Sequence, residues 1–301
     1  MTDPSATAAS IPLHYLDHPG GEPALLFLPG IMATAPMSED LISAGLSPRF
    51  RSLALDLRGR GKSQAPPAGS SPPTPAANYT MADHAADVLT LLDTLGIAQA
   101  VLIGHSFGGM LALYLAAHHP DRFPQIVVLD AAVSLATPEV RKALEPALAR
   151  LGAVSPSWDA YLEAVKQLPY FQGVWEPGLE RYFQEYVEIH SDGSVTQRVN
   201  REAILAAVEG LLAEDWPAIL QDVVQPVLLI NAVDSFGPAG FGPLLPRDAA
   251  LATVAKLASG HYLAVSGNHI TMIFGSHAHR VAEAICDFLT EEPPPADPVP
   301  A

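Results

Sequence analysis

Short apolar runs alternate along the chain with stretches whose apolar residues recur at helical spacing. The runs predict strands over 24–28, 52–56, 100–104, 126–130, 227–231 and 261–265. The amphipathic stretches predict helices over 81–96, 106–119 and 276–290. Such alternation is typical of a mostly parallel central sheet flanked by helices, so we expect an α/β fold.

Residues 133–224 interrupt this alternation. The segment is helix-patterned, has no convincing strand and holds all three tryptophans, Trp158, Trp175 and Trp216. We predict a helical cap, or lid, inserted into a core formed by residues 1–132 and 225–290. A cap over a sheet edge leaves a crevice where ligands bind. Trp158, Trp175 and Tyr170 are therefore candidate substrate-binding residues, although most aromatics of the segment are expected to pack cap against core.

Two segments rich in proline are predicted to lie outside the packed elements. Residues 64–79 contain proline, glycine and serine in the pattern of a surface loop. Residues 291–301 form a tail with the composition of a disordered segment.

Composition narrows the choice of compartment and partner. The 301 residues, 49% of them hydrophobic, suffice for one large domain, and the N-terminus has no secretory pattern. A single cysteine, Cys286, suits a reducing cytoplasm, and no stretch has the length of a membrane span. The formal charge of −16 argues against nucleic acid or an anionic membrane as partner. We expect a cytoplasmic protein and leave oligomerisation open.

The stretch "IGHSFGGM" (103–110) places Ser106 between glycines, after an apolar run and before a helical pattern. Strand, G-x-S-x-G and helix together form the pattern of a nucleophile elbow, a tight turn that exposes a reactive serine at a helix N-terminus. The alternative is a glycine-rich turn with a helix-capping serine.

With these motifs the chain resembles the α/β-hydrolase superfamily. "LLFLPGIM", "LALDLRGRGKS", "VLIGHSFGGMLALYLAAHHPDRF", "IVVLDAA" and "SGNHITM" follow one another in that family's order. The resemblance implies an α/β-hydrolase fold in which a serine, an acid and a histidine follow in that order. His269 lies after the last predicted strand and before the final helix, and it is the histidine that fits as the general base.

Two aspartates fit as the acid. Asp234 lies near the superfamily's commonest acid position but one residue short of it. Asp130 ends the strand at 126–130, where polyketide-type thioesterase domains carry their acid. Those domains also share the H-x-T-M pattern seen in "NHITM". We favour Asp130 and keep Asp234 as the alternative, since many hydrolases retain a structural aspartate at the position of Asp130.

The resemblance also implies where a tetrahedral oxyanion would be held. The donors would be the main-chain N–H groups of Phe107, directly after the serine, and of Ile31. Ile31 follows Pro29-Gly30, where the family usually has His-Gly. The nearby "RGRGKS" (58–63) resembles the end of a phosphate-binding loop, but Asp56 stands where that motif needs glycine. A nucleotide site is therefore not expected.

These residues predict a serine hydrolase that cleaves a small apolar carboxylic ester, or else a lactone or thioester, through an acyl-enzyme. We expect no metal and no organic cofactor, because the sequence has no metal-ligand cluster or dinucleotide fingerprint. One alternative is non-hydrolytic chemistry on the same fold: cofactor-free oxygenation, perhydrolysis or carbon–carbon cleavage. The other is a catalytically silent binding protein.

Overall fold

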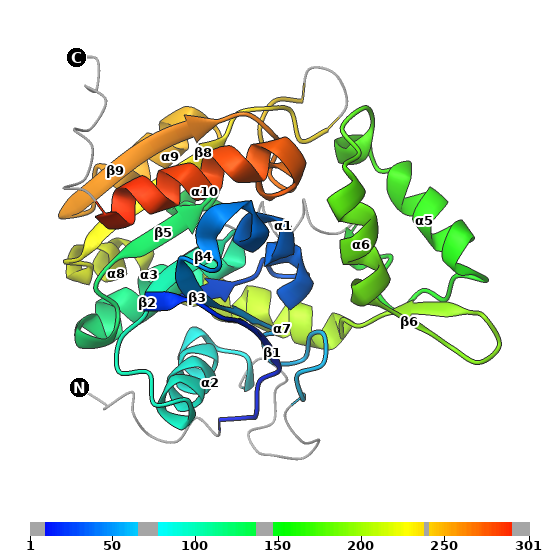
Figure 1. The fold of residues 1–301 in the computed structure, drawn as a ribbon, viewed down its shortest axis with the longest axis horizontal. Helices are drawn as coiled ribbons and strands as arrows, with labels where there is room; N and C mark the ends of the chain where they lie inside the picture. The colour runs from blue at the N-terminus through cyan, green and yellow to red at the C-terminus, as the bar shows by residue number, and fades with distance from the viewer. Residues whose placement is uncertain (1–9, 66–77, 137–146, 238–240, 291–301) are drawn as a thin grey trace.

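The computed structural model describes residues 10–65, 78–136, 147–237 and 241–290. Within them, seven strands form one sheet in the order β1-β3-β2-β4-β5-β8-β9 (Figure 1). The strands are β1 (Tyr15–His18), β2 (Gly21–Leu28), β3 (Phe50–Leu55), β4 (Val101–His105), β5 (Ile126–Leu129), β8 (Pro226–Ala232) and β9 (Ser259–Val265). Only β1 runs antiparallel to its neighbour. All six expected strands are confirmed. The short, polar β1 was not predicted.

The expected helices are present as α2 (Met81–Thr94), α3 (Phe107–His118) and α10 (Gly275–Thr290). Thr80 begins α2 with a capping box, in which its hydroxyl accepts from the Asp83 N–H and the Asp83 carboxylate accepts from the Thr80 N–H. Helix α3 is buried on all sides between the sheet and neighbouring helices. Helix α10 packs against the short helical segment around α1 (Glu39–Leu41). The expected mostly parallel sheet flanked by helices is therefore confirmed.

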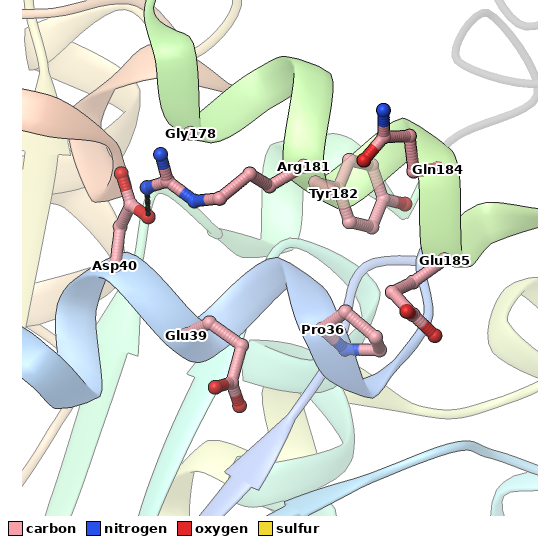
Figure 2. A pocket seen from close by; sticks show the side chains of 8 residues that line it. All are labelled: Pro36, Glu39, Asp40, Gly178, Arg181, Tyr182, Gln184 and Glu185. Atoms are coloured by element: carbon pink, nitrogen blue, oxygen red, sulfur yellow. Dashed lines mark hydrogen bonds and ion pairs between the residues drawn. The ribbon is translucent and has the colours of Figure 1, made fainter.

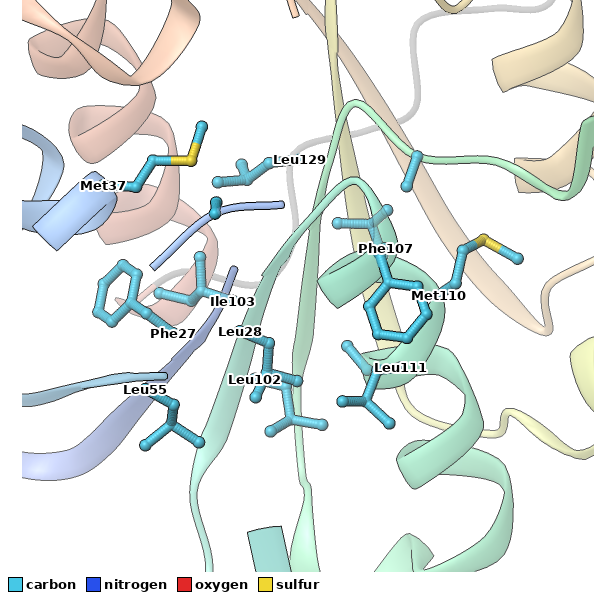
Figure 3. Close-up of a cluster of buried hydrophobic side chains, with 14 of the residues drawn as sticks. Phe27, Leu28, Met37, Leu55, Leu102, Ile103, Phe107, Met110, Leu111 and Leu129 are labelled. Carbon is cyan, nitrogen blue, oxygen red and sulfur yellow. The ribbon is translucent and has the colours of Figure 1, made fainter. Parts of the chain in front are cut away.

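The elbow between β4 and α3 stands on a dense apolar cluster. Side chains of β2, β4 and α3 interlock below the turn, among them Phe27, Leu28, Ile103 and Met110 (Figure 3). Each of these four side chains is at most 2% exposed. Close packing resists even small shifts, so the main chain that carries Ser106 is held rigidly from beneath.

Residues 133–224 contain the helices α5 (Trp158–Lys166), α6 (Pro177–Tyr186), α7 (Arg201–Leu212) and α8 (Trp216–Asp222). The expectation that this segment has no strand is wrong. Strands β6 (Val187–Ile189) and β7 (Val195–Gln197) pair antiparallel around a turn at Asp192-Gly193. Three residues are too few to show an alternating pattern. Figure 1 shows α5, α6 and β6 to one side of the sheet, whereas α8 packs against α3.

Most of the loop predicted over 64–79 and the whole tail predicted over 291–301 lie outside the described residues. In the described part of the chain, no helix is long and apolar enough to cross a membrane.

Candidate active site

The strand order reverses between β2 and β4, the two strands that carry the candidate residues at their carboxyl ends. From β2 the chain moves outward to β3 and then returns to β4 on the other side of β2. Ligands of open α/β sheets bind at such a reversal, beyond the carboxyl ends of the strands. The loop 29–31 follows β2 and Ser106 follows β4, so both lie at this point.

Ser106 occupies a strained turn that its glycine neighbours make possible. Its φ of 53° and ψ of −118° are rare for a residue with a side chain. A Cβ on Gly104 would stand 2.2 Å from the carbonyl oxygen of Gly108, and one on Gly108 would stand 2.0 Å from that of Leu28. Both distances are sterically forbidden. The Ser106 side chain is partly exposed, and its hydroxyl makes no hydrogen bond with any residue that the structure describes.

His269 and Asp130 form a buried pair. His269 Nδ1 lies 2.7 Å from Asp130 Oδ2, although 139 residues separate them in sequence. The other carboxylate oxygen, Oδ1, accepts from the N–H of Ala232 at 2.9 Å and from Asn231 Nδ2 at 2.8 Å. An ionised carboxylate only accepts, so the proton of the neutral imidazole lies on Nδ1. His269 Nε2 is then left as the basic nitrogen.

Asp234 makes a different contact. Its Oδ2 accepts from the N–H of Gly267 at 2.7 Å, and its own N–H donates to the Gly267 carbonyl at 3.1 Å. Asp234 is exposed. Its two hydrogen bonds hold the main chain at Gly267, two residues before His269. Of the two candidate acids, the structure brings Asp130 to the imidazole.

The residues predicted to carry the oxyanion donors belong to segments next to Ser106. A Cβ on Gly30 would stand 3.6 Å from the Ser106 Cβ and 3.1 Å from His105 Nδ1, so loop 29–31 passes directly over the elbow. Phe107 is the first residue of α3. Among the described residues, no acceptor takes the main-chain N–H of Ile31 or of Phe107. Two free donors beside a serine are what acyl transfer requires.

His105, inside the elbow, fixes the main chain of His269. Its Nε2 donates to the His269 carbonyl oxygen at 2.7 Å, and the two rings lie 4.6 Å apart. Burial, assisted by the nearby His269, lowers the pKa of His105 to about 3. His105 therefore stays neutral at neutral pH. Its one ring proton lies on Nε2, the nitrogen that donates to the His269 carbonyl oxygen. Nothing in the sequence around His105 predicts this contact.

Aromatic side chains connect the residues 133–224 with the histidine. Tyr170 stacks on Phe236 at 4.7 Å, and Phe236 meets the His269 ring edge to face at 5.4 Å. The Tyr170 carbonyl also accepts from Asn268 Nδ2 at 2.7 Å. Of the three predicted substrate-binding residues, Tyr170 thus lies close to His269. Phe236 was missed, because a single phenylalanine in a loop carries no recognisable pattern.

Trp158 and Trp175, the two tryptophans predicted to bind substrate, make their ring contacts away from His269. Trp158 stacks on Tyr161 at 5.9 Å. Trp175 packs against Phe171 and Phe183 at 5.4 and 6.1 Å, with the Lys166 ammonium 5.2 Å from its ring centre. Their ring contacts are with other residues of the segment 133–224.

A separate pocket of about 320 Å³ lies between α6 and the helical segment 36–40, which includes the start of α1 (Figure 2). Its lining includes Glu39, Asp40 and Glu185, and Arg181 bridges it by an ion pair to Asp40 at 2.7 Å. Its lining contains neither Ser106, Asp130, His269 nor a residue of loop 29–31, so it is distinct from the candidate site. No three His, Cys, Asp or Glu side chains within the described ranges stand close enough together to hold a metal ion.

Comparison with known proteins identifies the family of the fold. The sequence profile of the family described as alpha/beta hydrolase fold matches residues 23–275. A Caulobacter vibrioides protein named as a carbamate hydrolase, RutD, is 29% identical over 92% of this chain and 95% of its own. The crystal structure of E-2-(acetamidomethylene)succinate hydrolase superposes with a TM-score of 0.74 at 23% identity, covering 93% of this chain and 95% of that one.

A third comparison is with the enol-lactonase of Burkholderia xenovorans, at a TM-score of 0.64 and 24% identity over 93% of this chain and 96% of that chain. At such identities the two structures show the shared fold alone. The more specific resemblance to polyketide-type thioesterases stays a prediction, carried by Asp130 and the "NHITM" motif.

Proposed function

Because the chain belongs to the α/β-hydrolase fold family, we propose that it is a serine hydrolase that cleaves a small carboxylic ester, with lactones and thioesters as the next candidates. Ser106 is the proposed nucleophile and His269 the general base. Asp130 orients the imidazole, and the N–H groups of Ile31 and Phe107 hold the oxyanion.

The reaction is acyl transfer to water in two halves. Ser106 Oγ attacks the carbonyl carbon while His269 Nε2 takes the hydroxyl proton, and the oxygen of the tetrahedral intermediate accepts from the two N–H groups. The intermediate collapses, and the proton on Nε2 passes to the leaving alcohol. Water then adds to the acyl-enzyme in the same way, and the acid is released with Ser106 regenerated.

The observation that carries this proposal is the 2.7 Å contact between His269 and Asp130, made at the sheet edge that also presents Ser106. A buried carboxylate with every oxygen engaged holds one tautomer of the ring. A binding protein has no need of that arrangement beside a strained, exposed serine.

The relatives support hydrolysis, since their names describe a carbamate hydrolase, a hydrolase of a succinate derivative and an enol-lactonase. The aromatic rings of Tyr170 and Phe236 beside His269 favour a substrate with an apolar portion. We further propose that residues 133–224 act as a cap over this site.

Hydrolysis of p-nitrophenyl acetate by the full chain tests the proposal, with a panel of longer esters, lactones and acyl thioesters to define the class. We expect turnover by the wild type and a loss to background in Ser106→Ala, whose melting temperature should match the wild type. Equal amounts of p-nitrophenol and acetate are the expected products. Undiminished turnover by Ser106→Ala, or no turnover of any of the substrates by the wild type, would refute it.

A further inference from the structure

Arg60 touches both residues that carry the proposed oxyanion donors. It lies in the loop after β3, and its side chain is buried, with the residue only 1% exposed. Its Nε donates to the Ile31 carbonyl oxygen at 2.6 Å, and the guanidinium carbon lies 5.4 Å from the centre of the Phe107 ring. Neither contact follows from the "RGRGKS" pattern.

Arg60 differs from its neighbour Arg58 in how its charge is paired. Within the described part of the chain no carboxylate forms an ion pair with it. The neighbouring Arg58 instead engages Asp83 and Asp87, at 3.6 and 2.7 Å. Burial lowers the pKa of Arg60 to about 10, so the side chain remains cationic at neutral pH. A buried, unpaired cation is costly, and a fold that retains one calls for an explanation.

The hydrogen bonds of Arg60 leave part of the guanidinium unused. Nη1 donates to the Arg58 carbonyl at 2.9 Å, but Nη2 has no hydrogen-bond partner among the described residues. His84, whose ring lies 5.3 Å from that of Phe107, has a pKa well below its usual value because of burial and of the charges of Arg60 and Arg58. His84 is therefore neutral and does not balance the charge of Arg60.

The main chain around Arg60 is also held. The N–H of Gly61 donates to the Arg198 carbonyl at 2.7 Å, and Arg60 forms an isolated β-bridge with Val199. These contacts join the loop after β3 to the segment 133–224. The guanidinium therefore keeps a fixed place beside loop 29–31.

We propose that Arg60 is a positioning residue of the oxyanion hole. Its hydrogen bond to the Ile31 carbonyl fixes the main chain there, so that the Ile31 N–H faces the elbow. Its unpaired charge, in surroundings of low dielectric, favours the negative charge that develops on the substrate oxygen. The inference rests on the proposed function, because without acyl transfer there is no oxyanion to hold.

Three variants separate the two contributions. Arg60→Gln keeps an N–H donor for Ile31 and removes the charge, Arg60→Lys keeps the charge and removes the planar fork, and Arg60→Met removes both. Arg51→Gln is the matched control, since Arg51 is partly exposed and pairs with Asp17 at 2.8 Å on the far strands β1 and β3. Melting temperatures identify the folded variants.

The readouts are kcat and KM for p-nitrophenyl acetate and the Kd of a trifluoromethyl ketone, whose serine adduct carries an oxyanion. A lost oxyanion donor costs about two to three orders of magnitude, so for a residue acting through Ile31 we expect roughly a tenfold to hundredfold loss of kcat in Arg60→Met. The inhibitor should weaken by a similar factor and KM should change little. Arg60→Gln and Arg60→Lys should fall in between, and they decide the matter if Arg60→Met does not fold.

A kcat and inhibitor affinity within twofold of wild type in the Gln and Lys variants would overturn the proposal. A rise in KM confined to esters that bear a carboxylate, with kcat unchanged, would also overturn it and make Arg60 a substrate anchor. Both results leave the wild type a hydrolase. A wild type that hydrolyses nothing would instead refute the proposed function and this role with it.

Discussion

The replacement Asp130→Asn is the most informative single change at the site. Asp130 Oδ1 accepts from two donors, one of them the main-chain N–H of Ala232, which cannot turn away. The amide of an asparagine would therefore keep its oxygen on that side and direct its NH₂ group at His269. An imidazole facing an N–H donor must present an unprotonated Nδ1, so its proton moves to Nε2.

The wrong tautomer removes the base. With Nε2 protonated, the imidazole has no lone pair for the Ser106 proton. An aspartate-to-asparagine change of this kind in the chymotrypsin triad lowers kcat by about 10⁴, which corresponds to about 5.5 kcal/mol. We expect a loss of that order for Asp130→Asn. The hydrogen bonds at Oδ1 survive, so the free energy of unfolding should fall by only about 1–3 kcal/mol.

Asp234→Asn is the matched control. Asp234 accepts one hydrogen bond, from the Gly267 N–H, and an amide oxygen can accept it equally well. Its kcat should stay within a few-fold of wild type. The assay is steady-state hydrolysis of p-nitrophenyl acetate, with urea unfolding to confirm that both variants fold. Asp130 is not the triad acid if Asp130→Asn keeps more than about a tenth of wild-type kcat, or if Asp234→Asn is the variant that loses it.

Three further changes probe the surroundings of the triad. In Gly30→Ala the new Cβ would stand 3.1 Å from His105 Nδ1. We expect this contact to displace loop 29–31 and lower kcat roughly tenfold, with little change in melting temperature. An unchanged kcat would refute the close approach. Phe236→Ala should raise KM for long-chain esters more than for the acetate, whereas an equal rise for both would argue against a role in substrate recognition. His105 titrates near pH 3 when folded and near pH 6.5 when unfolded, so the unfolded chain binds the proton first and stability falls as pH drops below about 6.5. In His105→Gln, urea unfolding at pH 7.5 and pH 5 should show a smaller difference, and an identical difference would contradict the shift.

The sheet and its main helices were predictable because their patterns are long. Strand β8 contains an unbroken buried apolar run, and helix α10 buries residues at helical spacing along its length. Signals of that length can be read without any knowledge of tertiary contacts. The hairpin of β6 and β7 and the edge strand β1 have three or four residues each. Their pairing depends on neighbours that sequence spacing does not reveal.

Ser106 was predictable for a related reason. Its turn requires glycine at positions 104 and 108. The steric requirement is therefore visible in the five consecutive residues 104–108. The choice between Asp130 and Asp234 was harder, because both follow strands whose ends meet at one edge. What separates them is the direction of a side chain. Asp130 has a φ of 50° that aims its carboxylate at the His269 ring, and no sequence pattern encodes that angle.

The contacts of Arg60 and Phe236 at the candidate site could not be predicted from the sequence. Each acts across the fold, one on loop 29–31 and the other on the ring of His269. Arg60 lies within "LALDLRGRGKS", but that motif does not indicate a contact with loop 29–31, and a loop arginine is usually solvated. Phe236 belongs to no recognisable motif. Their placement depends on how the segment 133–224 and the loops of the sheet edge pack together.

Covalent trapping is the sharpest test of Ser106 as an activated nucleophile. The full chain is incubated with a fluorophosphonate, and intact mass followed by peptide mapping locates the adduct. We expect one phosphonyl group per chain, on Ser106, with labelling abolished in Ser106→Ala and strongly slowed in Asp130→Asn. An unlabelled wild type, or an adduct on another residue that persists in Ser106→Ala, would contradict this assignment.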